Sequence, residues 1–146
     1  MRDMTSGVQL KRAISPVSVA DTTAQVSQII DRQGYQALTF LIATGAIADA
    51  DATFTVLVEH GNDSGLSDAA AVADDMLLSQ LAGTAPETAA AFQFDDDNEV
   101  RKIGYVGDKR YVRPTITPVA TASAALLAAV ALLGNPDLAP VEQAAA

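Results

Sequence analysis

Short stretches of alternating apolar and polar residues constrain the fold of this chain most strongly. In the clearest of them, residues 53–59 (TFTVLVE), the side chains of Phe54, Val56 and Val58 point the same way. A period of two residues is typical of a β-strand with one face on the core, and such stretches recur here about every ten residues. At 146 residues the chain is long enough for one domain with its own core. We therefore expect a single all-β domain.

Six further segments have strand-like patterns between turn residues. The first contains Pro16, which suits an edge strand or an arm better than a central strand. We predict that the last two form a hairpin through Gly107 and Asp108, residues that tolerate the positive φ of a tight turn. The segments are residues 8–19, 25–31, 35–43, 92–94, 102–106 and 110–117.

Two regions are harder to assign. Residues 124–133 (AALLAAVALL) consist of the best helix formers and run into Gly134-Asn135-Pro136, a good helix stop. However, an antiparallel sandwich of seven strands accepts an eighth at this place, and we favour the strand. Residues 66–87 lack a regular pattern. Either Ser67 begins a short helix that runs to Gln80, or the region is a long loop over the sheet.

Together these segments predict an antiparallel β-sandwich, jelly-roll-like, with seven or eight strands and an extended arm at each end. We assign residues 1–13 to the N-terminal arm, 14–133 to the sandwich and 134–146 to the C-terminal arm. The residues expected in the core are Phe40, Phe54, Val56, Val58, Ile103, Val112 and Ile116.

The strand at residues 35–43 (YQALTFLIA) is apolar on both faces. Phe40 belongs to the inward side, whereas Tyr35 and Leu41 point the other way. Such a strand is covered on both sides, here by the core and by a loop or a neighbouring subunit. With the alanine- and leucine-rich segment near the end of the chain, it predicts an apolar patch buried in a homo-oligomer, with a trimer favoured.

Five of the nine basic residues lie between positions 101 and 113, in a chain of formal net charge -9. Cations next to tyrosine are typical of protein interfaces, of single-stranded nucleic-acid grooves and of ordinary solvated strands. The acidic residues nearby would repel a phosphate chain, so we favour a contact with protein over nucleic acid. The expected interface residues are Arg101, Lys102, Arg110, Tyr111 and Arg113, with Tyr35 and Leu41.

No pattern in the sequence indicates catalysis, a cofactor or a metal. Cysteine is absent, and the single histidine, His60, follows a predicted strand, where a surface or turn position is expected. The acidic runs at residues 49–51 and 95–99 lack the internal glycine of a calcium loop, so we expect solvated loops or loops that face a basic neighbour. Nucleophile-elbow, phosphate-loop and dinucleotide motifs are also missing.

The beginning of the chain, MRDMTSGVQLKRAI, lacks the apolar stretch of a signal peptide. The longest apolar run has about ten residues, and a membrane-spanning helix needs about 20. We therefore expect a protein made in the cytoplasm, with no membrane partner.

Several sequence blocks, in order, resemble a family of small uncharacterised proteins encoded in the structural-gene clusters of tailed bacteriophages and prophages. The blocks are VSVADTTAQVSQIIDRQGYQALTFLIATG, ADADATFTVLVEHG, LSDAAAVADDMLL, RKIGYVGDKRYVRPTITP and LAAVALLGNPDLAPV, covering residues 17–141. The resemblance implies a structural role in the virion, on a compact β-sandwich or jelly-roll with LAAVALLG as its closing strand. It brings no functional residues.

Three functions follow from this resemblance and from the lack of an active site. The first is a minor capsid or decoration protein that binds the major capsid protein or other virion proteins. The second is a head–tail connector or tail ring protein. A sugar-binding module on the virion surface is the weakest, because the chain has no tryptophan and only three tyrosines.

Overall fold

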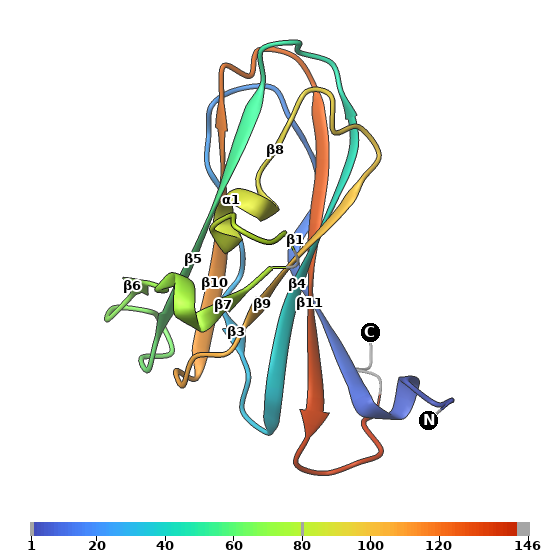
Figure 1. Ribbon diagram of the computed structural model, residues 1–146, viewed down its shortest axis with the longest axis vertical. Helices are drawn as coiled ribbons and strands as arrows, with labels where there is room; N and C mark the ends of the chain where they lie inside the picture. The colour runs from blue at the N-terminus through green and yellow to red at the C-terminus, as the bar shows by residue number, and fades with distance from the viewer. Residues whose placement is uncertain (1, 80, 143–146) are drawn as a thin grey trace.

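The computed structural model describes residues 2–79 and 81–142, which form two antiparallel sheets packed face to face (Figure 1). Sheet A has the order β1 (Val8–Val19), β11 (Ala125–Pro136), β4 (Tyr35–Ile47), β9 (Val100–Tyr105) and β7 (Leu77–Leu78). Sheet B has the order β2 (Gln25–Val26), β10 (Tyr111–Val119), β5 (Thr53–Gly61) and β6 (Ala70–Ala71). Two short strands pair beside this path, β3 (Ile30–Asp31) with β10 and β8 (Phe92–Gln93) with β5. The predicted β-sandwich is confirmed.

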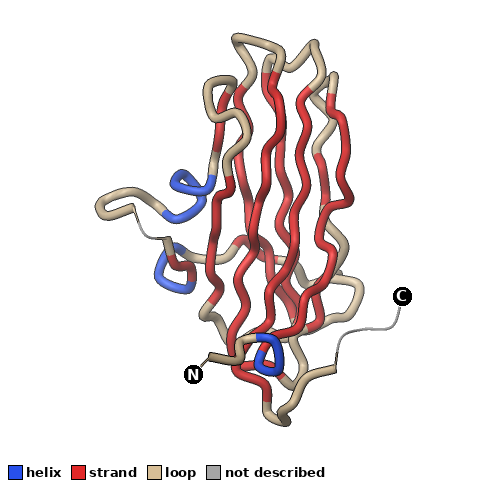
Figure 2. Tube along the Cα trace, turned by 90° about the vertical axis from the view of Figure 1, so that its right-hand side faces the viewer, coloured by secondary structure: helices blue, strands red, loops and turns tan. Residues whose placement is uncertain are grey.

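The long strands run side by side along the long axis of the molecule, as Figure 2 shows. All seven residues expected in the core are buried between the sheets. Three short helical elements complete the described chain: η1 (Thr5–Gly7), η2 (Asp74–Met76) and α1 (Pro86–Ala90). None of the helices in this described part has the length and apolar character needed to span a membrane.

The alanine- and leucine-rich segment is the strand β11, as we favoured. It lies between β1 and β4, and its alternate residues are buried: Ala125, Leu127, Ala129, Ala131 and Leu133. Pairing on both sides satisfies the backbone, so tertiary contacts override the high helix propensity of alanine and leucine.

The first segment is an edge strand, as Pro16 suggested. β1 is the outermost strand of sheet A, and its pairing with β11 shifts register between Ile14 and Val17, on either side of the proline. Proline lacks the N–H that a paired strand donates, so it is tolerated at this irregular edge.

The predicted hairpin through Gly107 and Asp108 is wrong. β9 pairs with β4 and β7 in sheet A, whereas β10 pairs with β5, β2 and β3 in sheet B. Residues 106–110 therefore cross from one sheet to the other. Neither Gly107 nor Asp108 has a positive φ, because a crossover between packed sheets does not need the tight turn that joins neighbouring strands.

The predicted segments differ from the structure in further places. Residues 8–13 of the expected N-terminal arm belong to β1, and residues 134–136 of the expected C-terminal arm belong to β11. Residue 1 and residues 143–146 of those arms lie outside the described residues. No helix begins at Ser67; η2 supplies a single 3-10 turn in that region, and Gln80 lies outside the described part. The segment 25–31 forms two short strands rather than one. The amide of Ser27 still donates to Pro114 of β10, but the amide of Gln28 donates to Ala13 of β1, which interrupts the pairing with β10.

Candidate protein-interaction surface

The side of sheet A that faces away from sheet B is formed by alternate residues of five strands. Along β11 and β4 the inward residues are buried and the intervening ones are partly or fully exposed. We call the outward set the outer face of sheet A. It consists of Leu10 and Arg12 on β1, Leu126, Ala128, Val130 and Leu132 on β11, Ala37, Thr39, Leu41 and Ala43 on β4, Val100 and Lys102 on β9, and Leu78 on β7.

Large apolar side chains are exposed on this face. The exposed fraction is 56% for Leu10, 56% for Leu78, 69% for Val100 and 47% for Leu126. Single exposed hydrophobic residues are normal on soluble proteins, but a contiguous apolar surface marks an interaction site. Here they surround Leu41 and Val130, so the patch is contiguous across the sheet.

The charge on this face is as unusual as its hydrophobicity. The five strands of sheet A contain no aspartate or glutamate, although the whole chain has 18 acidic residues. One row of directly paired residues crosses four strands of this face. Its two ends are the cations Arg12 and Lys102, and Val130 and Leu41 lie between them. Within the described chain neither cation forms a salt bridge, and Arg12 has only a 3.4 Å hydrogen bond to the side chain of Gln28.

A shallow groove of about 380 Å³ crosses the same face where β1 shifts register. Its lining includes Pro16, Val17, Ala43, Gly45, Leu126 and Ala128. Gly45 is required here, because a Cβ at this position would lie 2.8 Å from the Cβ of Leu126. The groove is thus a hollow of small residues beside an exposed leucine, suited to an apolar side chain of a partner.

The structure separates the basic residues expected to form one interface. The residues of these two strands that were expected in the core, Ile103, Val112 and Ile116, are buried. However, Lys102 is on the outer face of sheet A, whereas Tyr111 and Arg113 are on the outer face of sheet B, on the opposite side of the molecule. The 101–113 segment therefore does not form one surface.

Three of its arginines are paired within the chain. Arg113 contacts Glu59 at 2.8 Å and Arg110 contacts Asp31 at 2.8 Å. The hydrogen bond from Arg110 lowers the pKa of the Asp31 carboxyl below its usual value. The guanidinium of Arg110 also lies 5.0 Å from the ring centre of Tyr111.

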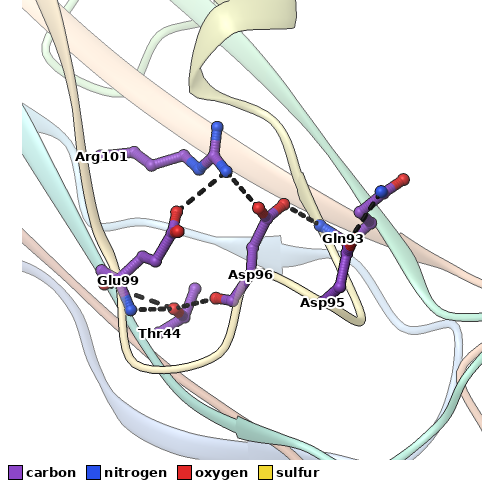
Figure 3. Close-up of polar contacts among 6 residues, drawn as sticks. All are labelled: Thr44, Gln93, Asp95, Asp96, Glu99 and Arg101. Carbon is purple, nitrogen blue, oxygen red and sulfur yellow. Dashed lines mark hydrogen bonds and ion pairs between the residues drawn. The ribbon is translucent and has the colours of Figure 1, made fainter.

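Arg101 organises the acidic loop at residues 95–99 (Figure 3). Its Nη2 lies 2.6 Å from Asp96 Oδ1 and 3.0 Å from Glu99 Oε2. Thr44 Oγ1 donates to the carbonyl oxygen of Asp96 at 2.8 Å and accepts from the amide of Glu99 at 3.0 Å. The loop thus faces a basic residue of its own chain.

The other acidic run, residues 49–51, also makes contacts within its own chain. The Asp49 carboxylate accepts hydrogen bonds from the backbone amides of Asp51 and Ala122, and these bonds lower its pKa. Among the described residues, no group of three or more histidine, cysteine, aspartate or glutamate side chains could hold a metal ion.

The expected surface position of His60 is wrong. Only 9% of this residue is exposed, and its Nδ1 lies 2.8 Å from the hydroxyl oxygen of Tyr105 on the other sheet. Burial lowers the pKa of the imidazole. The alternation of Phe54, Val56 and Val58 continues to His60 and was the signal for its inward position.

Of the remaining expected interface residues, Leu41 is central to the outer face of sheet A. Tyr35 is half-buried and packs against the edge of the core. Sequence reasoning missed Leu10, Arg12 and Leu126. The signal that could have found them is the absence of acidic residues from every long segment that forms sheet A.

No protein-family model and no curated protein matches the chain. Among solved structures, the chain is similar in fold to the PBSX exported protein XepA, with a TM-score of 0.54 and 10% identity over 88% of this chain. The chain spans 38% of the XepA chain. The xylan-binding module CBM15 has a TM-score of 0.42 and 11% identity, covering 93% of this chain and 95% of the module. Pili of Bacillus endospore appendages give 0.41 and 12%, covering 88% of both chains.

Proposed function

We propose that the protein is a structural component of a bacteriophage virion, of the minor capsid or decoration type, that works by protein–protein contact. The resemblance of its sequence blocks to phage structural-cluster proteins supports the setting. The observation that carries the mode of action is the outer face of sheet A, which is contiguous, apolar and free of acidic residues. Apolar burial supplies most of the affinity of such a contact, and charge sets its register.

The size of this face fits a specific contact. Five strands about 4.8 Å apart, with residues about 3.3 Å apart along strands of up to 13 residues, give a face on the order of 800 Å². A standard protein interface buries about 800 Å² on each partner. No described segment of the chain covers this face, so we infer that it is covered on assembly.

The test compares two leucines on central strands of the two sheets. Leu41→Glu places a charge in the middle of the outer face of sheet A, and Leu57→Glu places the same charge on the outer face of sheet B. We expect Leu41→Glu to reduce incorporation into virions at least tenfold, because a carboxylate would be desolvated in the contact. Leu57→Glu should be incorporated like wild type.

Incorporation is measured by quantitative mass spectrometry of virions from the genome that encodes the chain, after circular dichroism shows that both variants fold. Equal incorporation of the two variants would refute the role of the face. Absence of the wild-type protein from virions would refute the virion role itself. The copy number also separates decoration, with hundreds of copies, from a connector or tail ring, with six or twelve.

A further inference from the structure

The partner of the outer face of sheet A can be identified more closely. We propose that this face binds residues 137–142 of a second copy of the chain, so that Arg12 and Lys102 of one copy meet Glu142 and Asp137 of the next. This inference rests on the proposed function in taking the face as an assembly surface. It adds the partner and the direction of the contact.

The C-terminal segment, residues 137–142, also exposes apolar side chains. Leu138 is 86% exposed, and the residues that follow it, Ala139, Pro140 and Val141, have no charge. Asp137 and Glu142 enclose this short apolar stretch. The segment therefore displays an exposed leucine between two carboxylates, of which that of Asp137 accepts a 2.7 Å hydrogen bond from Gln36. The outer face of sheet A displays apolar residues between two cations.

The separation of the two cations lies within the reach of the two carboxylates on an extended segment. Arg12 and Lys102 are separated by three strand-to-strand steps of about 4.8 Å, which gives about 14 Å. Asp137 and Glu142 are five residues apart and can span at most about 18 Å. Residues 137–140 form bends in the single copy, so the segment must extend on the neighbouring face to reach both cations, with Leu138 over Val130 and Leu41.

The segment cannot make this contact within its own copy. The amide of Asp137 donates to the carbonyl of Gly34 at 2.9 Å, and the amide of Val141 donates to that of Ser6 at 2.8 Å. Both bonds hold the segment at the end of the sandwich near η1 and the end of β11 (Figure 1). Val130 is seven residues back along β11, about 23 Å away. The C-terminal segment can therefore contact this face only on a neighbouring copy.

Stacking of two outer faces on each other is disfavoured for the opposite reason. Neither face carries an acidic residue, so Arg12 and Lys102 of the two copies would approach one another without a carboxylate between them. Like charges brought together in an apolar contact repel strongly. A tail-to-face contact is heterologous, and repeated contacts of this kind close into a ring, such as a trimer, or continue as a chain.

The experiment measures self-association of the full chain by sedimentation velocity from low micromolar to millimolar concentration. The double variants Arg12→Glu/Lys102→Glu and Asp137→Lys/Glu142→Lys should each associate at least tenfold more weakly than wild type. An equimolar mixture of the two should associate more strongly than either variant alone, because each contact between the two variants again joins opposite charges. Leu138→Ser should weaken association without changing any charge.

Matched controls carry the same changes in net charge elsewhere. Arg2→Glu/Lys109→Glu corresponds to the face variant, and Asp74→Lys/Asp75→Lys corresponds to the tail variant. Both controls should associate like wild type. All variants should unfold on heating at a midpoint close to that of wild type, which shows that the sandwich is folded.

A wild-type chain that is monomeric at every concentration would overturn the inference, as would a mixture that associates no more strongly than either variant alone. These outcomes are distinct from failure of the proposed function. If the protein associates through its C-terminal segment but never enters virions, this inference stands and the virion role is refuted.

Discussion

The two outer faces of the sandwich differ in how their side chains are satisfied. On sheet B, exposed apolar residues (Val26, Leu57 and Val119) alternate with outward threonines on β5 and β10, and Arg113 faces Glu59 across the strands in a salt bridge. On sheet A, the outward residues are mostly leucine, valine and alanine, and the two cations lack carboxylate partners in the described chain. Sheet B therefore pairs its outward cation with a carboxylate of the same chain, whereas sheet A does not.

This difference shows where a small sandwich can place an interface. The core needs one apolar face from each sheet, and both sheets supply it. A second apolar face on sheet A adds nothing to the fold of the monomer and lowers its solubility. The contact with another subunit proposed above would account for an apolar face that carries no acidic residue.

Filling the groove on sheet A should give the largest change in stability. Gly45→Ala places a Cβ 2.8 Å from the Cβ of Leu126, too close for two carbon atoms, so β11 or Leu126 must move. Overpacking of this kind costs about 1–3 kcal/mol. We expect the free energy of unfolding, measured by urea denaturation, to fall by that amount.

The control for this change is Gly7→Ala. A Cβ at Gly7 would have no atom within 4 Å, so its free energy of unfolding should stay within about 0.5 kcal/mol of wild type. If Gly45→Ala is equally neutral, Leu126 moves freely, and the outer face of sheet A is more deformable than the packing indicates.

Removing one cation from each face should sharpen the comparison. Arg113 and Glu59 are about three-quarters buried, so Arg113→Ala leaves a poorly solvated carboxylate without its partner. We expect a loss of about 1–2 kcal/mol in the free energy of unfolding, between the values for exposed and buried pairs. Lys102→Ala on sheet A should change it by less than about 0.5 kcal/mol. Similar losses for the two variants, measured by urea denaturation, would contradict the view that only sheet B satisfies its own charges.

Much of the fold follows from local pattern. The alternation at residues 53–59 and the two apolar faces at residues 35–43 gave the strands and their inward sides, because period-two burial is a local property. The pairing of β9 and β10 was not predictable in this way. Glycine and aspartate at a turn are compatible with both a hairpin and a crossover, and only the partners of each strand decide between them.

The candidate site was predictable in part for the same reason. The pattern of its own strand places Leu41 on a second apolar face. Arg12 and Lys102 are 90 residues apart in the sequence, and only the order of β1, β11, β4 and β9 places them in one row of the sheet. The clustering of basic residues in the sequence was misleading. Arg110 and Arg113 follow closely after Arg101, but their side chains pair with acidic residues that precede them by more than 50 positions.

The smallest expected effect concerns the polar contact that joins the two sheets inside the core. His60 on β5 is hydrogen-bonded to Tyr105 on β9, and its pKa is lowered by burial and by the charge of Lys109, with Asp108 and Asp68 acting in the opposite direction. In the unfolded chain the imidazole titrates near its usual value of 6.5. As the pH falls through that value, the unfolded chain takes up the proton first, so folding stability falls toward lower pH. Each pKa unit of difference corresponds to about 1.4 kcal/mol.

His60→Gln keeps a hydrogen-bonding side chain toward Tyr105 and removes the titration. Both proteins are measured by urea denaturation from pH 7.5 to 5.5. As the pH falls, the free energy of unfolding of wild type should therefore decrease relative to that of His60→Gln. Carboxyl groups common to both proteins, including Glu87 with its raised pKa, cancel in this difference. A difference that stays constant over this range would mean that His60 binds its proton equally well in the folded and unfolded chain, and that the contact between the sheets is open to water.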